Sequence, residues 1–188
     1  EEGLPKTTIR SVSKRARVAM RTIYLHFEHR EAMVRAAIQE FFHQSVEAGQ
    51  QPGGPRTLSE LLGRLDHLRD AVMASRSYAA SLAPTYFSAS RDGIHDTLKG
   101  FALSHVLPWL DHLLDQAGAE SSPEWRAFVH SQVANAEYAV INDALAGRLP
   151  EQKLALLLKL AVLSSIAGLL PQPPAEVGMA LSELRRQL

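Results

Sequence analysis

The sequence predicts an all-α protein, and three observations support this fold class. Apolar residues recur at intervals of three and four along the 188-residue chain, whereas no stretch alternates convincingly as a β-strand. Clusters of glycine and proline separate the periodic stretches, as the sequence GQQPGGP at residues 49–55 does. The chain is 46% hydrophobic, which is enough to bury a sizeable core and excludes disorder as its main state.

The first thirty residues differ from the rest of the chain in charge. They hold seven bases and three acids, a balance of +4, and the remainder therefore carries −4 because the whole chain is neutral. The bases are Lys6, Arg10, Lys14, Arg15, Arg17, Arg21 and Arg30, and the acids are Glu1, Glu2 and Glu28. This division favours a head that meets a polyanion, although an ordinary solvated helix pair would give the same charge.

Two short helices are predicted within this basic head, at about residues 8–16 and 19–27, with Thr7 or Thr8 as the first cap. Each helix has an apolar seam at helical spacing. The seam residues are Ile9, Val12 and Ala16 in the first helix and Ile23 and Phe27 in the second. Two short helices joined by a tight turn form a helix-turn-helix pattern, a unit that places its second helix in the major groove of DNA.

Longer helices are predicted for the rest of the chain. Their approximate ranges are 30–48, 58–74, 78–89, 93–116, 123–146, 150–170 and 175–187. Pro84 and Pro108 fall inside two of these ranges and should kink or split them. Gly147 and the sequence PQPP at residues 171–174 are suited to end the helices before them.

One segment resembles the DNA-binding head of TetR-type bacterial transcriptional regulators. It spans residues 7–34 and has the sequence TTIRSVSKRARVAMRTIYLHFEHREAMV. The resemblance is densest at the closing motif Ile23-Tyr24-Leu25-His26-Phe27. Arg17 replaces the family's usual turn glycine, and it need not adopt a left-handed conformation if the turn is relaxed. His29 replaces the usual Ser or Asn cap, a loss worth about 1 kcal/mol. The family's first helix would precede the point at which this sequence begins.

The resemblance implies which residues contact DNA. Ala19, Met20, Arg21 and Thr22 would begin the recognition helix, Thr8, Tyr24 and His26 would lie by phosphates, and Arg30 would clamp the DNA backbone. Among the first four residues, Arg21 alone can bind guanine O6 and N7 with two hydrogen bonds, so we assign it the main base contact. The alternative for Tyr24 is a place in the core.

Signatures of enzymes and metal sites are absent from the sequence. There is no G-x-S-x-G elbow, no phosphate-binding glycine loop, no H-E-x-x-H and no cysteine, so we expect no enzyme activity and no cofactor. His105 and His112 would stand about 10 Å apart along one helix, too far for one ion, and no metal site is expected. The apolar run at residues 154–170 is marginal for a membrane span, and a buried helix is favoured.

The body offers candidates for two further sites. As the resemblance implies, a small apolar or amphipathic effector could be lined by Tyr78, Tyr86, Phe101, Trp109 and Tyr138, with plain core packing as the alternative. A broad apolar stripe includes Leu154, Leu158, Ala161, Ser165 and Leu169. In the family such helices form a four-helix dimer interface, whereas the alternative is that the stripe packs only within the chain.

The sequence therefore predicts a DNA-binding head at residues 1–45 and an effector-binding, dimerising body at residues 46–188. We expect a cytoplasmic repressor that binds a palindromic operator in double-stranded DNA as a homodimer, is released by its effector and does not engage a membrane. The alternative is a small helical enzyme or ligand carrier whose basic head is incidental.

Overall fold

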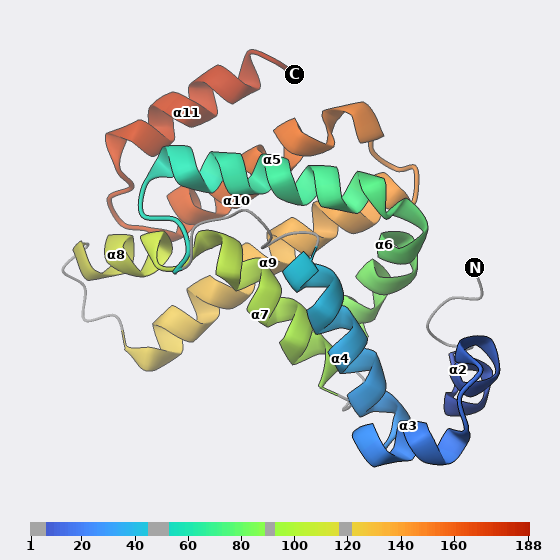
Figure 1. Cartoon of the computed structure of the whole chain (residues 1–188). Coiled ribbons are helices and arrows are strands. Elements are labelled where there is room, and N and C mark those ends of the chain that lie inside the picture. The colour runs from blue at the N-terminus through green and yellow to red at the C-terminus, as the bar shows by residue number, and fades with distance from the viewer. Residues whose placement is uncertain (1–6, 45–52, 89–92, 117–121) are drawn as a thin grey trace.

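The computed structural model describes residues 7–44, 53–88, 93–116 and 122–188, and every regular element in these ranges is helical (Figure 1). The all-α prediction is confirmed. The helices are α2 (Ile9–Ala16), α3 (Met20–His26), α4 (Arg30–Phe42), α5 (Leu58–Ala74), α6 (Arg76–Leu82), the 3-10 helix η2 (Ala83–Phe87), α7 (Ile94–Val106), α8 (Trp109–Gln116), α9 (Pro123–Leu145), the 3-10 helix η3 (Glu151–Lys153), α10 (Leu154–Leu169) and α11 (Ala175–Arg185). The predicted helix ends at Ala48 and Ala89 lie outside the described residues.

The head is built from α2, α3 and the first turns of α4, at one end of the molecule (Figure 1). Its small core consists of Ile9, Ile23 and Met33, with Val12 and Phe27 packed against them. The predicted seam of the two short helices is thus confirmed except at Ala16, which is exposed in the last turn of α2.

Helix α4 belongs to both parts of the protein. Met33 lies in the core of the head, whereas the next residue, Val34, is buried in the body together with Ile38 and Phe42. In the body, α4 packs on α7. One continuous helix therefore joins the core of the head to the core of the body.

The body is filled by two apolar clusters. One joins the end of α4, the second half of α5, α6, η2, α7, the second half of α9 and the start of α10. The other joins the first half of α5, α8, the first half of α9, the end of α10 and α11. Side chains at helical spacing on α5 and α9 thus reach both clusters, which ties the body together.

Both internal prolines interrupt helices, as predicted. The predicted helix at residues 78–89 is α6 followed at Ala83 by η2, with Pro84 in the first turn of η2. The predicted helix at residues 93–116 is split into α7 and α8, because Leu107 is extended before Pro108.

Gly54 makes a close backbone contact with this break. Its φ is +78°, and a Cβ atom at Gly54 would lie 1.7 Å from the carbonyl oxygen of Leu107. Only glycine fits there, and the segment before α5 is held against the corner between α7 and α8.

Helix α10 lies along α9 and also contacts α5 and α11. Leu154 and Leu158 are fully buried within the chain. The prediction that these two residues belong to a dimer interface is therefore wrong, because side chains enclosed by their own chain cannot reach a second copy. Residues Glu151–Leu169 are long and apolar enough to cross a membrane, but a core helix of a soluble protein meets the same criterion.

Candidate nucleic-acid interface and ligand cavity

Thr8 begins α2 with a capping box. Its Oγ1 accepts a hydrogen bond from the Ser11 backbone N–H at 3.0 Å, and Ser11 Oγ accepts one from the Thr8 N–H at 2.9 Å. Thr8 is exposed, and the cap uses its oxygen only as an acceptor. Its hydroxyl proton thus remains able to point toward a phosphate.

The turn between α2 and α3 contains Arg17 in a left-handed conformation, with φ 55° and ψ 36°. The turn is therefore not relaxed, and Arg17 adopts the conformation that glycine usually fills. Hydrogen bonds fix this geometry: the Val18 N–H donates to the Ser13 carbonyl at 3.1 Å, and Ser13 Oγ donates to the Val18 carbonyl at 2.6 Å. A left-handed conformation costs a residue with a Cβ atom about 1 kcal/mol more than it costs glycine.

Helix α3 presents most of its surface to solvent. Ile23 is its buried residue, while Met20, Tyr24 and Leu25 are 47%, 55% and 75% exposed. The alternative that Tyr24 belongs to the core is excluded by this exposure. The residues of this segment to which the resemblance assigns DNA contacts are all exposed, namely Ala19, Met20, Arg21, Thr22, Tyr24 and His26.

The head is basic on its exposed surface. Across α2, the turn and α3, residues 7–27 contain no acidic residue. The exposed bases of this segment are Arg10, Lys14, Arg15, Arg17 and Arg21. Positive charge without competing carboxylates is the electrostatic pattern of a surface that binds the phosphates of nucleic acid.

Arg30 has partners inside the head. Its Nε donates to the Thr7 carbonyl oxygen at 2.5 Å, and its Nη1 lies 3.2 Å from Glu31 Oε1. These bonds connect the start of α4 to the residues before α2. The backbone N–H of Glu31 and the Arg30 side chain lower the pKa of the Glu31 carboxyl, which stays ionised in the first turn of α4.

His29 caps α4, so the predicted loss of a cap is wrong. His29 Nδ1 accepts a hydrogen bond from the Ala32 backbone N–H at 3.1 Å. An imidazole nitrogen replaces the hydroxyl or amide oxygen that usually fills this position.

A cavity of about 30 Å³ lies beneath the body end of α4. It is lined by Phe41, Phe42, Leu68, Ala71, Val72, Ala79, Leu82, Ala83, Glu137, Tyr138 and Ile141. The lining side chains thus come from α4, α5, α6, η2 and α9, and α4 connects the cavity to the head.

Four of the five aromatic residues predicted to line an effector pocket are at or around this cavity. Tyr138 lines it, and Tyr86 stacks on Tyr138 with ring centroids 4.1 Å apart. Tyr78 packs against Phe41, and Phe101 stacks on Phe42. Trp109 is buried in the other apolar cluster, so we leave it out of the candidate pocket. The effector role of these residues stays a prediction.

Glu137 is not among the residues singled out from the sequence, and its neighbour His105 is considered there only as a metal ligand, although both carry a signal of burial. Glu137 stands at helical spacing from Val133, Ala134 and Ile141, and His105 follows Leu98 and Ala102 in the same way. Both are 2% exposed or less. A charged or polar side chain in an otherwise apolar stripe marks a buried polar site.

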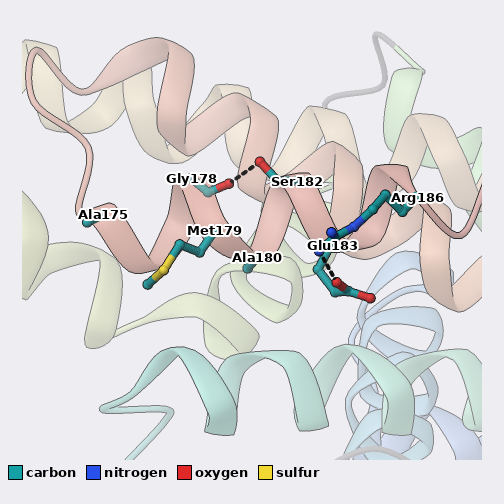
Figure 2. A pocket seen from close by; sticks show the side chains of 7 residues that line it. All are labelled: Ala175, Gly178, Met179, Ala180, Ser182, Glu183 and Arg186. Carbon is teal, nitrogen blue, oxygen red and sulfur yellow. Dashed lines mark hydrogen bonds and ion pairs between the residues drawn. The ribbon is translucent and has the colours of Figure 1, made fainter.

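A second hollow follows the outer face of α11 (Figure 2). It is lined by Ala175, Gly178, Met179, Ala180, Ser182, Glu183 and Arg186. Ser182 Oγ donates to the Gly178 carbonyl oxygen at 2.9 Å, and Arg186 pairs with Glu183 (Figure 2). The hollow is open, comes from one helix and has its polar groups paired, so the cavity beneath α4 is the better candidate for a ligand site.

Within the described residues no group of three or more His, Asp or Glu side chains could hold a metal ion.

Residues 1–37 match the family model described as bacterial regulatory proteins, tetR family. No curated protein and no solved structure matches the chain. The match covers the helix-turn-helix head and not the body.

Proposed function

Since the chain is a TetR-type, DNA-binding transcriptional regulator with an N-terminal helix-turn-helix head, we propose that it is a cytoplasmic repressor. It binds a palindromic operator in double-stranded DNA as a homodimer, and a small molecule in the body releases it. The observation that carries this proposal is the exposed recognition helix within a segment that has five exposed bases and no acid. We also propose residues 1–45 and 46–188 as the two domains.

Base readout is assigned to the start of α3. Arg21 can donate two hydrogen bonds to guanine, while Ala19 and Met20 offer apolar contact to a thymine methyl group and Thr22 offers a hydroxyl. Contacts to phosphates are assigned to Thr8, Tyr24 and His26. These residues are all exposed, as the roles require.

Arg30 is assigned two roles. Its bonds to Thr7 and Glu31 hold the start of α4 against the residues before α2. Its side chain is also partly exposed, so it can approach the DNA backbone. Substitution of Arg30 would therefore weaken DNA binding through both the contact and the geometry of the head.

The dimer face is assigned to the outer side of α10. Leu157, Ala161, Ser164 and Gly168 follow at spacings of four, three and four, and each is partly or fully exposed. Ser165 and Leu169 lie beside this row and are also partly exposed. Small residues allow two helices to approach closely, and a twofold axis through such a face would pair two heads with a palindrome.

Release is assigned to the cavity beneath α4. Phe41 and Phe42 line it, so a molecule that enlarges the cavity displaces the body end of α4. The head end of the same helix carries Met33 in the core beneath the recognition helix. A ligand that prefers the displaced position of α4 therefore changes the spacing of two recognition helices, and operator and ligand weaken each other's binding by the same factor.

The test is selection of binding sites from random duplexes with the wild type and with Arg21→Ala. We expect a palindrome with half-site centres about 34 Å apart, or a multiple, and an affinity that falls steeply with salt. Arg21→Ala should lose base preference at one position per half-site and about 1–3 kcal/mol of binding. Arg185→Ala, which removes an exposed arginine of α11, is the matched control and should change neither.

An unchanged preferred sequence for Arg21→Ala would remove the assignment of base readout to this residue. Equal binding of the wild type to all duplexes would contradict operator recognition. That second outcome would favour the alternative of a helical enzyme or ligand carrier with an incidental basic head.

A further inference from the structure

Two buried polar side chains lie at the contact between α7 and α9. His105 and Glu137 are each 2% exposed, and His105 Nδ1 lies 3.8 Å from Glu137 Oε1, too far for a hydrogen bond. In the described part of the chain, Glu137 Oε2 and both ring nitrogens of His105 have no hydrogen-bond partner. Folded proteins rarely leave buried polar atoms without a partner, so this pair requires an explanation.

Glu137 is also part of the wall of the cavity beneath α4. The other described side chains that line the cavity are apolar or aromatic, and none of them is basic. Phe41, Phe42 and Tyr138 contribute three aromatic rings. The cavity therefore combines one carboxyl group with several aromatic surfaces.

This combination distinguishes between ligand classes. A wholly apolar ligand would leave the Glu137 carboxyl without a partner, and an anion would find no basic side chain in the lining to pair with. A protonated nitrogen would form a charge-assisted hydrogen bond with Glu137 and would also be attracted to the faces of Phe41, Phe42 and Tyr138. A cation is thus the class that the lining favours.

We propose that Glu137 recognises the effector through a protonated nitrogen carried on a compact apolar frame, an inference that rests on the effector site proposed above. The cavity of about 30 Å³ has room for about one water molecule. An amine larger than that must displace neighbouring side chains, and Phe41 and Phe42 of α4 are among them. Recognition and displacement of α4 thus occur at one place.

Binding of a cation should also release a proton. Burial raises the pKa of Glu137 well above its ordinary value, so the empty site favours the protonated form of the carboxyl. The other titratable groups around it are His105 of α7, Tyr86 of η2 and Tyr138 of α9, with Arg64 of α5 near His105. An ammonium group that pairs with the carboxylate replaces about one proton, which passes to solvent.

The test is isothermal titration calorimetry with matched probes on two frames, butyl and 2-phenylethyl. Each frame is used as the ammonium ion, the alcohol and the carboxylate. We expect the ammonium probe to bind the wild type about 10- to 100-fold more tightly than the alcohol, with release of about one proton. Glu137→Gln should abolish both effects. Glu124→Gln, on the exposed first turn of α9, is the matched control and should retain them.

Three outcomes would each overturn the proposal: equal binding of alcohol and ammonium, unchanged binding of the ammonium probe by Glu137→Gln, or no binding of any ammonium probe at about 10 mM. A concentration of this order detects millimolar affinity. The same probes are then tested for release of the selected operator DNA. Ammonium binding through Glu137 without DNA release would uphold the recognition site and contradict effector-driven release. DNA release by a neutral probe, equal in wild type and Glu137→Gln, would uphold regulation and overturn the role of Glu137.

Discussion

Glu137→Gln should change the pH dependence of stability in a way that can be calculated from burial. Because burial raises the pKa of Glu137 above the ordinary 4.5, the folded state holds a proton that the unfolded state loses. The stability contributed by this group is complete below pH 4.5 and is lost as the pH rises toward the folded pKa. Each pH unit in that window costs the wild type about 1.4 kcal/mol relative to Glu137→Gln.

His105 has the opposite effect in a neighbouring window. Burial lowers the pKa of His105 from 6.5 to about 4, and the positive charge of Arg64 acts in the same direction. The neutral imidazole therefore contributes stability that is complete above pH 6.5 and is lost as the pH falls toward 4. The total is about 3 kcal/mol, from about 1.4 kcal/mol for each pH unit.

The contributions of Glu137 and His105 to the free energy of unfolding change in opposite directions between pH 4.5 and 6.5. Their sum therefore varies little with pH in the wild type over this interval. Glu137→Gln should leave only the His105 slope, and its stability relative to the wild type should rise by about 1.4 kcal/mol between pH 5 and 6. His105→Gln should leave only the Glu137 slope and gain relative stability as the pH falls through the same interval.

Urea unfolding at constant protein concentration and at half-unit steps from pH 5 to 8 measures these differences. Glu124→Gln provides a carboxylate control, because Glu124 is exposed and a hydrogen bond from Ser122 lowers its pKa. A difference between Glu137→Gln and the wild type that does not vary with pH would refute the reasoning, because it would mean that Glu137 is ionised in the folded protein.

Three further substitutions test other features. Arg17→Gly should raise the free energy of unfolding by up to about 1 kcal/mol by relieving the left-handed turn, whereas Arg17→Ala should give no gain, and equal effects in urea melts would argue against strain at this position. Gly54→Ala should cost about 2 kcal/mol or more because its Cβ atom would overlap a carbonyl oxygen, while Gly53→Ala, with open space around it, should cost about 1 kcal/mol; similar losses in chemical unfolding would contradict the close contact. Ala161→Arg should convert the proposed dimer to a monomer in sedimentation velocity at micromolar concentration, and Ala175→Arg should not; a dimer in both variants would move the interface away from the outer side of α10.

Much of the fold could be predicted from the sequence because helical periodicity and breakers act locally. Ile23 and Phe27 fall on the inner side of α3 as their spacing predicts, and Pro108 separates α7 from α8. The errors arise where a side chain has a partner that local spacing does not specify. His29 supplies a cap with a ring nitrogen, and Arg17 accepts a conformation that glycine usually fills.

In the candidate sites, too, local spacing predicts some features, whereas others depend on contacts between distant parts of the chain. The exposed positions of the recognition helix follow from its period, and Tyr138 lies in the wall of the cavity beneath α4, while its effector role stays a prediction. The burial of Leu154 and Leu158 depends on how α10 is rotated against α9, which an all-round apolar helix does not reveal. The approach of His105 to Glu137 joins two helices distant in sequence, and no local pattern predicts such a contact.

The division of α4 between two cores has a consequence for exchanging heads between regulators. Met33 and Val34 are adjacent in the chain but face different interiors, so a cut after the recognition helix would leave one interior without its residues. A transplanted head must keep the head side of α4 from the donor and the body side, Val34, Ile38 and Phe42, from the recipient. Each residue of α4 in the fusion is therefore chosen from the donor or the recipient according to the side of the helix on which it lies. A single junction in the sequence does not preserve both interiors.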